Sequence, residues 1–209
     1  KQEIDCEIKV KRDMISDCTA GKHNCLFIRD NVNFSEDRLK MVIAHEIETH
    51  IITAVNGADQ DYEMFGRGFG DYILTQEGLA IWNQEKILDH DVEKNYRSAS
   101  LVLIVNFAID HSFSETVDYC FKMGINFKKA FRMVSKIKRG ISDTSQRGAF
   151  TKDINYFAGY LQIENFVSSG GNLMDLYYGK YNLRDLDLIK SIPNLKTPKL
   201  LPFFLRSVS

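Results

Sequence analysis

The sequence predicts an α+β fold that is predominantly helical, with a small β-sheet at its N-terminal end. Apolar and polar residues alternate over 4–10, which is typical of a strand, whereas apolar residues recur at helical spacing from residue 35 onward. With 209 residues, 44% of them hydrophobic, the chain can bury one sizeable core. We therefore expect one domain over 1–209, mainly β in 1–34 and mainly helical in 35–209.

The composition favours a cytoplasmic protein that binds neither nucleic acid nor membrane. The 27 basic and 28 acidic residues leave a net charge of -1, whereas such partners usually require a strong basic bias. The longest apolar run, 101–108, is far shorter than the ~20 residues of a membrane span. No signal-peptide pattern is present. Because the chain opens at Lys1 directly into a strand-like segment, we expect it to be part of a longer protein.

The cysteines are expected to be reduced structural thiols, because their spacing is irregular. They are Cys6, Cys18, Cys25 and Cys120. Cys18, His23 and Cys25 could ligate a metal, but no second pair of Cys or His residues completes a zinc knuckle.

The N-terminal elements follow from local patterns. The alternating segment 4–10 and the apolar run 25–28 are expected to be strands, with turn-forming residues over 19–24 between them. A helix then begins at Ser35, a good N-cap residue, and Asn56-Gly57 is expected to end it. Its apolar face consists of Leu39, Val42, Ile43, Ile47 and Ile51.

The next segment, 58–73, is rich in glycine and aromatic residues and is expected to be a loop. Its part 62–72 could form a substrate wall or lid, and the alternative is a simple packed connection. A second helix is expected from about Gln76 to Leu88, with Thr75 as its N-cap. The rest of the sequence is expected to form an array of helices.

The helices of this array are expected over 92–111, 114–123, 126–138, 151–168, 172–178 and 183–191. Ser114 and Thr151 are expected to be N-caps, because hydroxyl side chains favour that position. Gly124 and Gly140 are expected to stop their helices.

The most informative segment is 45–50, an H-E-x-x-x-H pattern within the first helix. Neutral imidazoles are good zinc ligands, so we expect His45 and His50 to bind Zn2+. A carboxylate beside the first histidine can take a proton from metal-activated water, so Glu46 is expected to be the general base. The alternative is an exposed glutamate between two partly buried, hydrogen-bonded histidines.

The spacing of the two histidines predicts a distortion of this helix. In the familiar H-E-x-x-H pattern the histidines are four residues apart and share one face. Five residues turn an ideal α-helix by about 500°, so the side chains would point about 140° apart. An extra residue absorbed as a π-bulge would bring them together, and such bulges cluster at functional sites. We therefore expect a distorted turn near Ile47–His50.

A third metal ligand is expected from Glu77, which lies 27 residues after His50 near the start of the second helix. A carboxylate completes the ligand set of many catalytic zinc sites. Gly78 would let another backbone approach closely. The alternative is that Glu77 only stabilises its own helix N-terminus.

Three blocks of the sequence resemble the QEGLA-motif proteins, a family that includes the microtubule-associated tyrosine carboxypeptidases. Segment 45–50 is similar to the family's H-E-I-x-T-H, and 76–80 reproduces the QEGLA run itself. Segment 147–159 is similar to a G-x-F-T-K-D-x-x-Y-x-x-G run, and Arg139-Gly140 resembles an R-G pair of the family. The resemblance therefore extends across most of the chain.

The resemblance implies a zincin-like metallopeptidase domain with the metal ligands and the base named above. It further implies a carboxypeptidase that acts on a peptide or protein C-terminus. The animal members remove a C-terminal tyrosine from tubulin. Glu48 and Arg147 stand where glycine is expected, which is more similar to the bacterial branch, so the tubulin substrate is not carried over.

The residues that contact the substrate are less sharply indicated. The oxyanion of the transition state needs a second donor, for which Tyr156 is favoured over Lys152 and Arg139. The terminal carboxylate of the substrate needs a cation, for which Arg139, Arg147 and Arg67 are candidates. We therefore expect Arg139, Lys152 and Arg147 to bind substrate. The alternatives are a core tyrosine and solvated basic residues.

The prediction is thus a zinc metallopeptidase, most consistent with a metallocarboxypeptidase. An endo- or aminopeptidase on the same site is one alternative, and a non-catalytic zinc-binding regulatory protein is another. Glu46 favours catalysis, because a purely structural zinc site needs no base.

Overall fold

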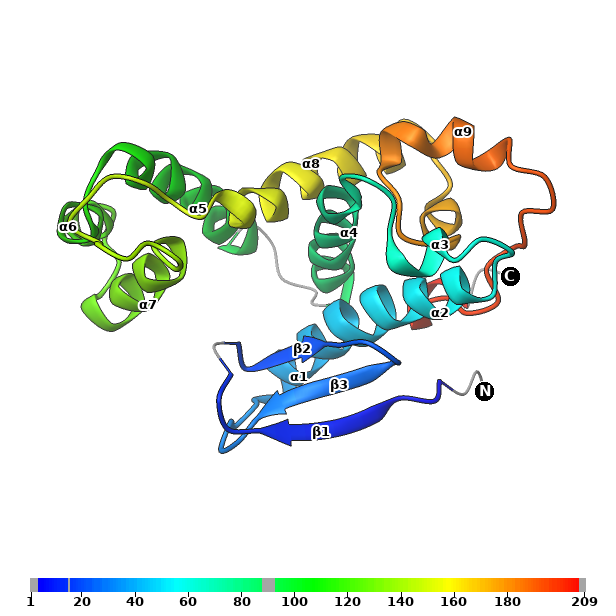
Figure 1. The fold of residues 1–209 in the computed structure, drawn as a ribbon, viewed down its shortest axis with the longest axis horizontal. Helices are drawn as coiled ribbons and strands as arrows, with labels where there is room; N and C mark the ends of the chain where they lie inside the picture. The colour runs from blue at the N-terminus through cyan, green and yellow to red at the C-terminus, as the bar shows by residue number, and fades with distance from the viewer. Residues whose placement is uncertain (1–3, 15, 88–92, 207–209) are drawn as a thin grey trace. The chain divides into compact units, whose positions relative to one another are not determined.

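The protein consists of many helices and a small three-stranded sheet (Figure 1), which confirms the α+β, predominantly helical prediction. The structure, a computed structural model, describes residues 4–14, 16–87 and 93–206. Among these residues, no helix has both the length and the apolar character that crossing a membrane requires.

The chain divides into two compact units. Unit 1 comprises 1–90 and 158–209, and unit 2 comprises 91–157. The expected single catalytic domain over 1–209 therefore stays a prediction.

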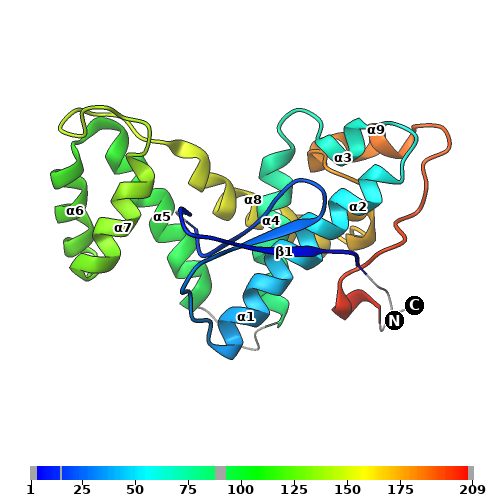
Figure 2. The ribbon, with the colours of Figure 1, turned by 60° about the horizontal axis from the view of Figure 1, so that its bottom comes forward.

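The sheet of unit 1 has the strand order β1-β3-β2. Its strands are β1 (Glu7–Lys11), β2 (Cys18–Ala20) and β3 (Cys25–Arg29). β1 runs parallel to β3, with Glu7 opposite Cys25, and β2 runs antiparallel to it, with Thr19 opposite Phe27. β2 is therefore an edge strand, and Figures 1 and 2 show the sheet beside the helices that follow it in the chain.

A continuous helical run carries the H-E-x-x-x-H segment. It consists of α1 (Glu36–Val42), the π-helix η1 (Ile43–Ile51) and α2 (Ile52–Ala58). Ser35 caps it as predicted, because its hydroxyl accepts the N–H of Arg38. The predicted stop at Asn56-Gly57 is wrong, since both residues lie inside α2. Asn56 instead binds the backbone of Leu200, donating to its carbonyl at 2.8 Å and accepting its N–H at 3.0 Å.

The next long helix, α4 (Tyr72–Ile87), begins earlier than predicted. Thr75 is not its N-cap, because the buried hydroxyl accepts the backbone N–H of Leu183 and is committed to that tertiary contact. The predicted loop before α4 also contains a short helix, α3 (Met64–Arg67). The predicted end at Leu88 lies outside the described residues.

Two glycines bring α4 against α8 (Ile154–Ser168). A Cβ atom added to Gly78 would lie 2.1 Å from the carbonyl carbon of Gly159, so the backbones touch there. The close approach predicted at Gly78 is confirmed. Around this crossing lies a core of Ile52, Leu79, Trp82, Ile163, Leu173, Leu176, Tyr177 and Leu201.

The rest of unit 1 consists of short helical turns. They are η3 (Leu173–Tyr177), η4 (Leu183–Asp185), α9 (Leu186–Lys190) and η5 (Phe203–Leu205). The helix predicted over 172–178 is a 3-10 helix, whose N-cap Asn172 accepts the N–H of Met174.

Unit 2 is helical and has its own core. It contains α5 (Glu93–Asp110), α6 (Phe113–Lys122), α7 (Phe127–Ile137) and η2 (Thr151–Asp153). Its buried apolar residues are Ile104, Val105, Ala108, Val117, Cys120, Ala130, Val134 and Ile137. The predicted helix start at residue 92 lies outside the described residues.

Two predicted caps in unit 2 are wrong, and both predicted stops are confirmed. Ser112, not Ser114, caps α6, because only Ser112 exchanges bonds with Glu115 in a capping box. Thr151 begins the 3-10 turn η2 and does not cap it. Gly124 and Gly140 follow α6 and α7 with φ angles of 78° and 81°, a conformation that glycine adopts most easily.

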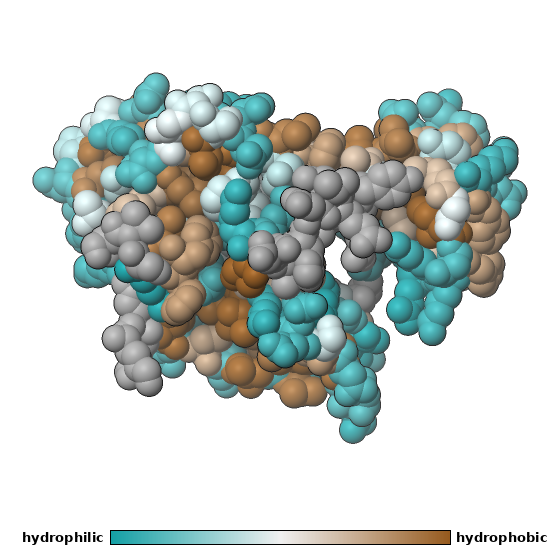
Figure 3. Space-filling model, turned by 180° about the vertical axis from the view of Figure 1, so that it is seen from behind, coloured by the Kyte–Doolittle hydropathy of each residue, from teal (hydrophilic) through white to brown (hydrophobic). Residues whose placement is uncertain are grey.

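Some large apolar residues remain at the surface. Phe127 and Phe203 are 63% and 71% exposed, respectively. Figure 3 shows groups of hydrophobic residues among hydrophilic ones on one face of the molecule. In unit 2 this exposure is clustered, because Phe127 is in ring contact with Phe121 and Phe131, which are also exposed.

Candidate metal centre

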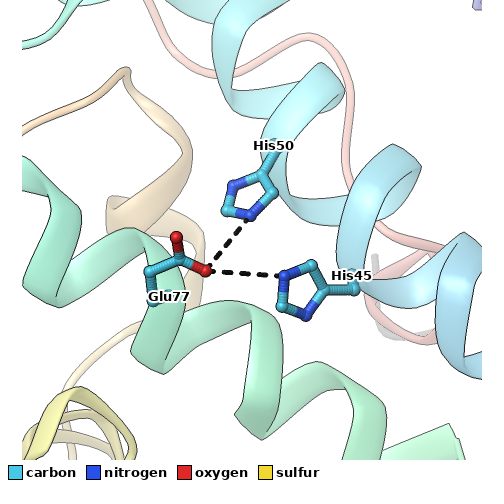
Figure 4. A group of neighbouring side chains, drawn as sticks. All are labelled: His45, His50 and Glu77. Carbon is cyan, nitrogen blue, oxygen red and sulfur yellow. Dashed lines mark ion pairs between the residues drawn. The ribbon is translucent and has the colours of Figure 1, made fainter. Parts of the chain in front are cut away.

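His45, His50 and Glu77 point toward one another in unit 1 (Figure 4). The two histidines come from η1 and the glutamate from α4. Glu77 Oε2 lies 3.5 Å from His45 Nε2 and 3.7 Å from His50 Nε2. One potential ligand atom from each residue lies within 4.8 Å of the other two. The fold thus assembles the three predicted metal ligands.

The π-helix explains how histidines five residues apart share one face. Hydrogen bonds of a π-helix join residues five apart, so side chains at that spacing lie nearly above one another. Ile52 shows this pattern, because its N–H donates to the carbonyl of Ile47. The predicted distortion is confirmed, and it extends over the nine residues of η1 rather than one turn.

The three donors fit a zinc ion in type, and the two separations between histidine and glutamate suit its coordination distances. Imidazole nitrogens and carboxylate oxygens bind zinc at about 2.0–2.2 Å, which places tetrahedral ligands about 3.3–3.5 Å apart. The separations of 3.5 and 3.7 Å come close to that range. Two histidines and a glutamate also leave a fourth position open, as catalytic zinc sites require.

Within the described part of the chain, this is the one group of three His, Cys, Asp or Glu residues arranged to hold a metal ion. Cys18, His23 and Cys25 do not form such a group. Burial raises the pKa of the Cys18 thiol to about 12, which disfavours the thiolate that a metal would need.

The electrostatics of the cluster favour a negative Glu77 facing positive charge. Burial by itself raises the pKa of Glu77, but hydrogen bonds from His45 and His50 outweigh it and hold that pKa well below its usual range. Burial likewise lowers the pKa of His50, but the hydrogen bond and charge of Glu77 raise it overall. The Glu77 carboxylate is therefore ionised, the form that binds a cation.

Gln76 orients one of the histidines. Its Oε1 lies 3.4 Å from Nδ1 of His50, and the side chain is buried. When Nδ1–H donates to this oxygen and Nε2 has lost its proton, the lone pair of Nε2 is available to bind a metal. No role was predicted for Gln76 from the sequence, although its position beside Glu77 in the QEGLA run was an available signal.

The predicted base, Glu46, is held by the sheet. Its Oε2 accepts the backbone N–H of Ala20 at 2.6 Å, and Ala20 is the last residue of the edge strand β2. The sequence predicted a turn over 19–24, but pairing with β3 keeps 18–20 extended. No side-chain pattern could have indicated this contact, because the donor is a backbone group.

Glu48 is buried and binds the C-terminal segment of unit 1. It is 8% exposed, and its Oε1 accepts the backbone N–H of Phe203 at 3.0 Å. Glu48 therefore holds the C-terminal segment of unit 1 against η1.

The remaining candidates stay predictions. Arg139, Arg147, Lys152 and Tyr156 belong to unit 2. Arg139 lies 3.3 Å from Asp153 and stacks over the ring of Phe150, so its guanidinium already has neighbours within that unit. Arg67, in unit 1, is exposed and pairs with Glu63 at 2.8 Å.

The fold and the site together define a mostly helical α+β protein with a His-His-Glu cluster beside a glutamate. A sequence profile of the family described as "Microtubule-associated tyrosine carboxypeptidase" matches residues 1–207, and the chain belongs to that family. The resemblance inferred from the three motif blocks is thereby confirmed.

Individual relatives are similar over most of this chain. A mouse protein named "Putative tyrosine carboxypeptidase MATCAP2" is 28% identical over 187 residues, which cover 86% of this chain and 36% of the relative. The human protein of the same name is 27% identical over 188 residues, with the same coverage of 86% and 36%. The mouse "Microtubule-associated tyrosine carboxypeptidase 1" is 27% identical over 178 residues, covering 81% and 37%. The chain thus spans little more than a third of the length of these relatives.

Proposed function

We propose that this chain is the catalytic part of a zinc-dependent, zincin-like metallopeptidase that removes residues from a peptide or protein C-terminus. The observation that carries the proposal is the convergence of His45, His50 and Glu77, with Glu46 next in sequence to the first ligand. The relatives' names, which describe tyrosine carboxypeptidases, support the choice of the C-terminus.

Metal binding and proton transfer fall to different residues in this proposal. His45, His50 and Glu77 would hold the zinc ion, which when bound supplies Lewis acidity toward the scissile carbonyl and toward water. Glu46 takes a proton from the attacking water and passes it to the leaving amine. The N–H of Ala20 holds the Glu46 carboxylate in place, and Gln76 holds His50.

The substrate contacts remain part of the proposal. A carboxypeptidase must bind the terminal carboxylate of its substrate, for which a basic side chain is suited. Arg139, Arg147 and Lys152 are the basic candidates, and Tyr156 is the candidate oxyanion donor. The reaction is proposed to take place in the cytoplasm, because the family's description names microtubules, which are cytoplasmic.

The direct test of the chemistry is Glu46→Gln. The amide has the shape of the carboxylate but cannot take the proton, so hydrolysis should fall by about 10²- to 10⁴-fold. Zinc content should be unchanged. Turnover is measured as mass loss from a peptide library that varies the C-terminal residue, and zinc by elemental analysis.

Glu48→Gln is the matched control, because it makes the same change two residues away and the new amide oxygen would still accept the N–H of Phe203. It should keep both zinc and activity. Normal cleavage by the Glu46→Gln protein would show that the catalytic assignment is wrong. Peptides with an amidated C-terminus or an acetylated N-terminus then separate the carboxypeptidase from an endo- or aminopeptidase.

A further inference from the structure

We propose that Thr49 is a positioning residue for the metal site, because its hydroxyl fixes the π-helical turn that puts His45 and His50 on one face. The inference rests on the proposed zinc site and concerns what holds that site in shape. The Thr49 hydroxyl acts through the backbone of η1 and through α4, and not through the ligand atoms themselves.

The first contact lies within the helix. The hydroxyl of Thr49 donates to the carbonyl of Ala44 at 2.8 Å, five residues back. A threonine in an α-helix usually bonds the carbonyl three or four residues back. The bond to Ala44 therefore matches the π-helical register, and it ends at the residue directly before His45.

The second contact leaves the helix. Asn83 donates its amide to the Thr49 hydroxyl at 2.7 Å and to the Tyr177 hydroxyl at 2.8 Å. Asn83 belongs to α4, six residues after Glu77. The hydroxyl of Thr49 thus joins the two elements that supply the three ligands.

Burial makes these bonds hard to replace. Thr49, Asn83 and Tyr177 are each 0% exposed. Water cannot take the place of a lost partner there, so removal of the hydroxyl would leave the Asn83 amide with one acceptor fewer. Without this bond the π-helical register loses a specific support, and the α-helical register would turn the two histidines apart.

The test compares Thr49→Val, which keeps the shape and removes the hydroxyl, with Thr49→Ser, which keeps the hydroxyl. Zinc affinity is measured by competition with a chromophoric chelator, and ligand geometry by the visible spectrum of the Co2+-substituted protein. Thr49→Val should weaken zinc binding by about 10- to 100-fold, as changes behind metal ligands commonly do. It should also alter the Co2+ spectrum. Thr49→Ser should keep the zinc affinity and the Co2+ spectrum of the wild-type protein.

Thr53→Val is the matched control. Thr53 is also 0% exposed, lies one turn further along, and donates to the carbonyl of Thr49 at 2.6 Å within the same helical run. Its loss removes a buried hydroxyl without removing the link to α4, so zinc affinity and the Co2+ spectrum should stay close to wild type. An equal loss of affinity in Thr53→Val would overturn the proposal.

A Thr49→Val protein with wild-type affinity and spectrum would overturn the inference and leave the zinc site intact. If that variant does not fold, Asn83→Ala removes the same link from the α4 side and should weaken zinc binding in the same direction. Unchanged affinity in Asn83→Ala would then overturn the inference. Wild-type protein that binds no zinc would overturn both this inference and the proposed function.

Discussion

Gly78 follows directly after the proposed ligand Glu77 and lets α4 touch α8 backbone to backbone. The carbonyl carbon of Gly159 occupies the space that a side chain at Gly78 would need. The position of a metal ligand on α4 therefore depends on a residue that has no side chain at all.

Gly78→Ala should destabilise the protein. The added Cβ would lie 2.1 Å from the carbonyl carbon of Gly159, so the helices must separate. Alanine favours a helix by about 1 kcal/mol over glycine, but overpacking costs about 1–3 kcal/mol or more, and backbone cannot move aside as a flexible side chain can. We expect a lower free energy of unfolding in urea.

Gly70→Ala is the control, because no atom lies within 4 Å of a Cβ added there. Its free energy of unfolding should change by less than about 0.5 kcal/mol. Equal stability of the Gly78→Ala and Gly70→Ala proteins would contradict the tight crossing of α4 and α8.

At the residue scale, sequence reasoning could find groups whose own chemistry is distinctive. His45, His50 and Glu77 could be selected as ligands because imidazole and carboxylate bind zinc. The contact between Ala20 and Glu46 could not be found, because a backbone N–H carries no sequence signal until the strand is placed.

At the scale of elements, most of the helices could be predicted from the helical spacing of their apolar residues. The five-residue spacing of two histidines predicted the distortion that η1 shows. Helix ends were predicted less well, because a side chain that could cap is also free to bind elsewhere. Thr75 and Asn56 both look like terminal residues, and both instead bind distant backbone groups, at Leu183 and Leu200.

The start of α6 gives a measurable case. Ser112→Ala removes the hydroxyl that accepts the N–H of Glu115 and breaks the capping box, so it should cost about 1 kcal/mol of stability. Ser114→Ala, two residues along and without a capping bond to the backbone of α6, should change stability by less than about 0.5 kcal/mol. Thermal unfolding of the two variants measures which serine stabilises α6. A larger loss of stability in Ser114→Ala than in Ser112→Ala would contradict the capping by Ser112.

At the scale of the whole molecule, the tertiary contacts could not be predicted from sequence patterns. The hydrogen bonds between Asn56 and Leu200 join residues 144 apart, and the bond that Glu48 accepts from the N–H of Phe203 joins residues 155 apart. Periodicity reports only which face of an element is apolar, so it cannot pair elements across such distances. The division into two compact units was likewise not visible in a sequence with no composition break.

The proposed function of the whole molecule depends on a metal ion bound by His45, His50 and Glu77. Binding to the folded state alone should stabilise the protein, by about 2.7 kcal/mol at a free zinc concentration 100 times the dissociation constant. Chelation should correspondingly lower the melting temperature. Alanine at any of the three positions should abolish this zinc-dependent stabilisation.

The most direct measurement is the zinc content of the purified protein and of its histidine and glutamate variants. We predict one zinc ion per chain in the wild-type protein and in His23→Asn, which changes an exposed histidine outside the cluster. His45→Ala, His50→Ala and Glu77→Ala should each lose the ion. Full zinc content in those three variants, or none in the wild-type protein supplied with zinc, would contradict the account.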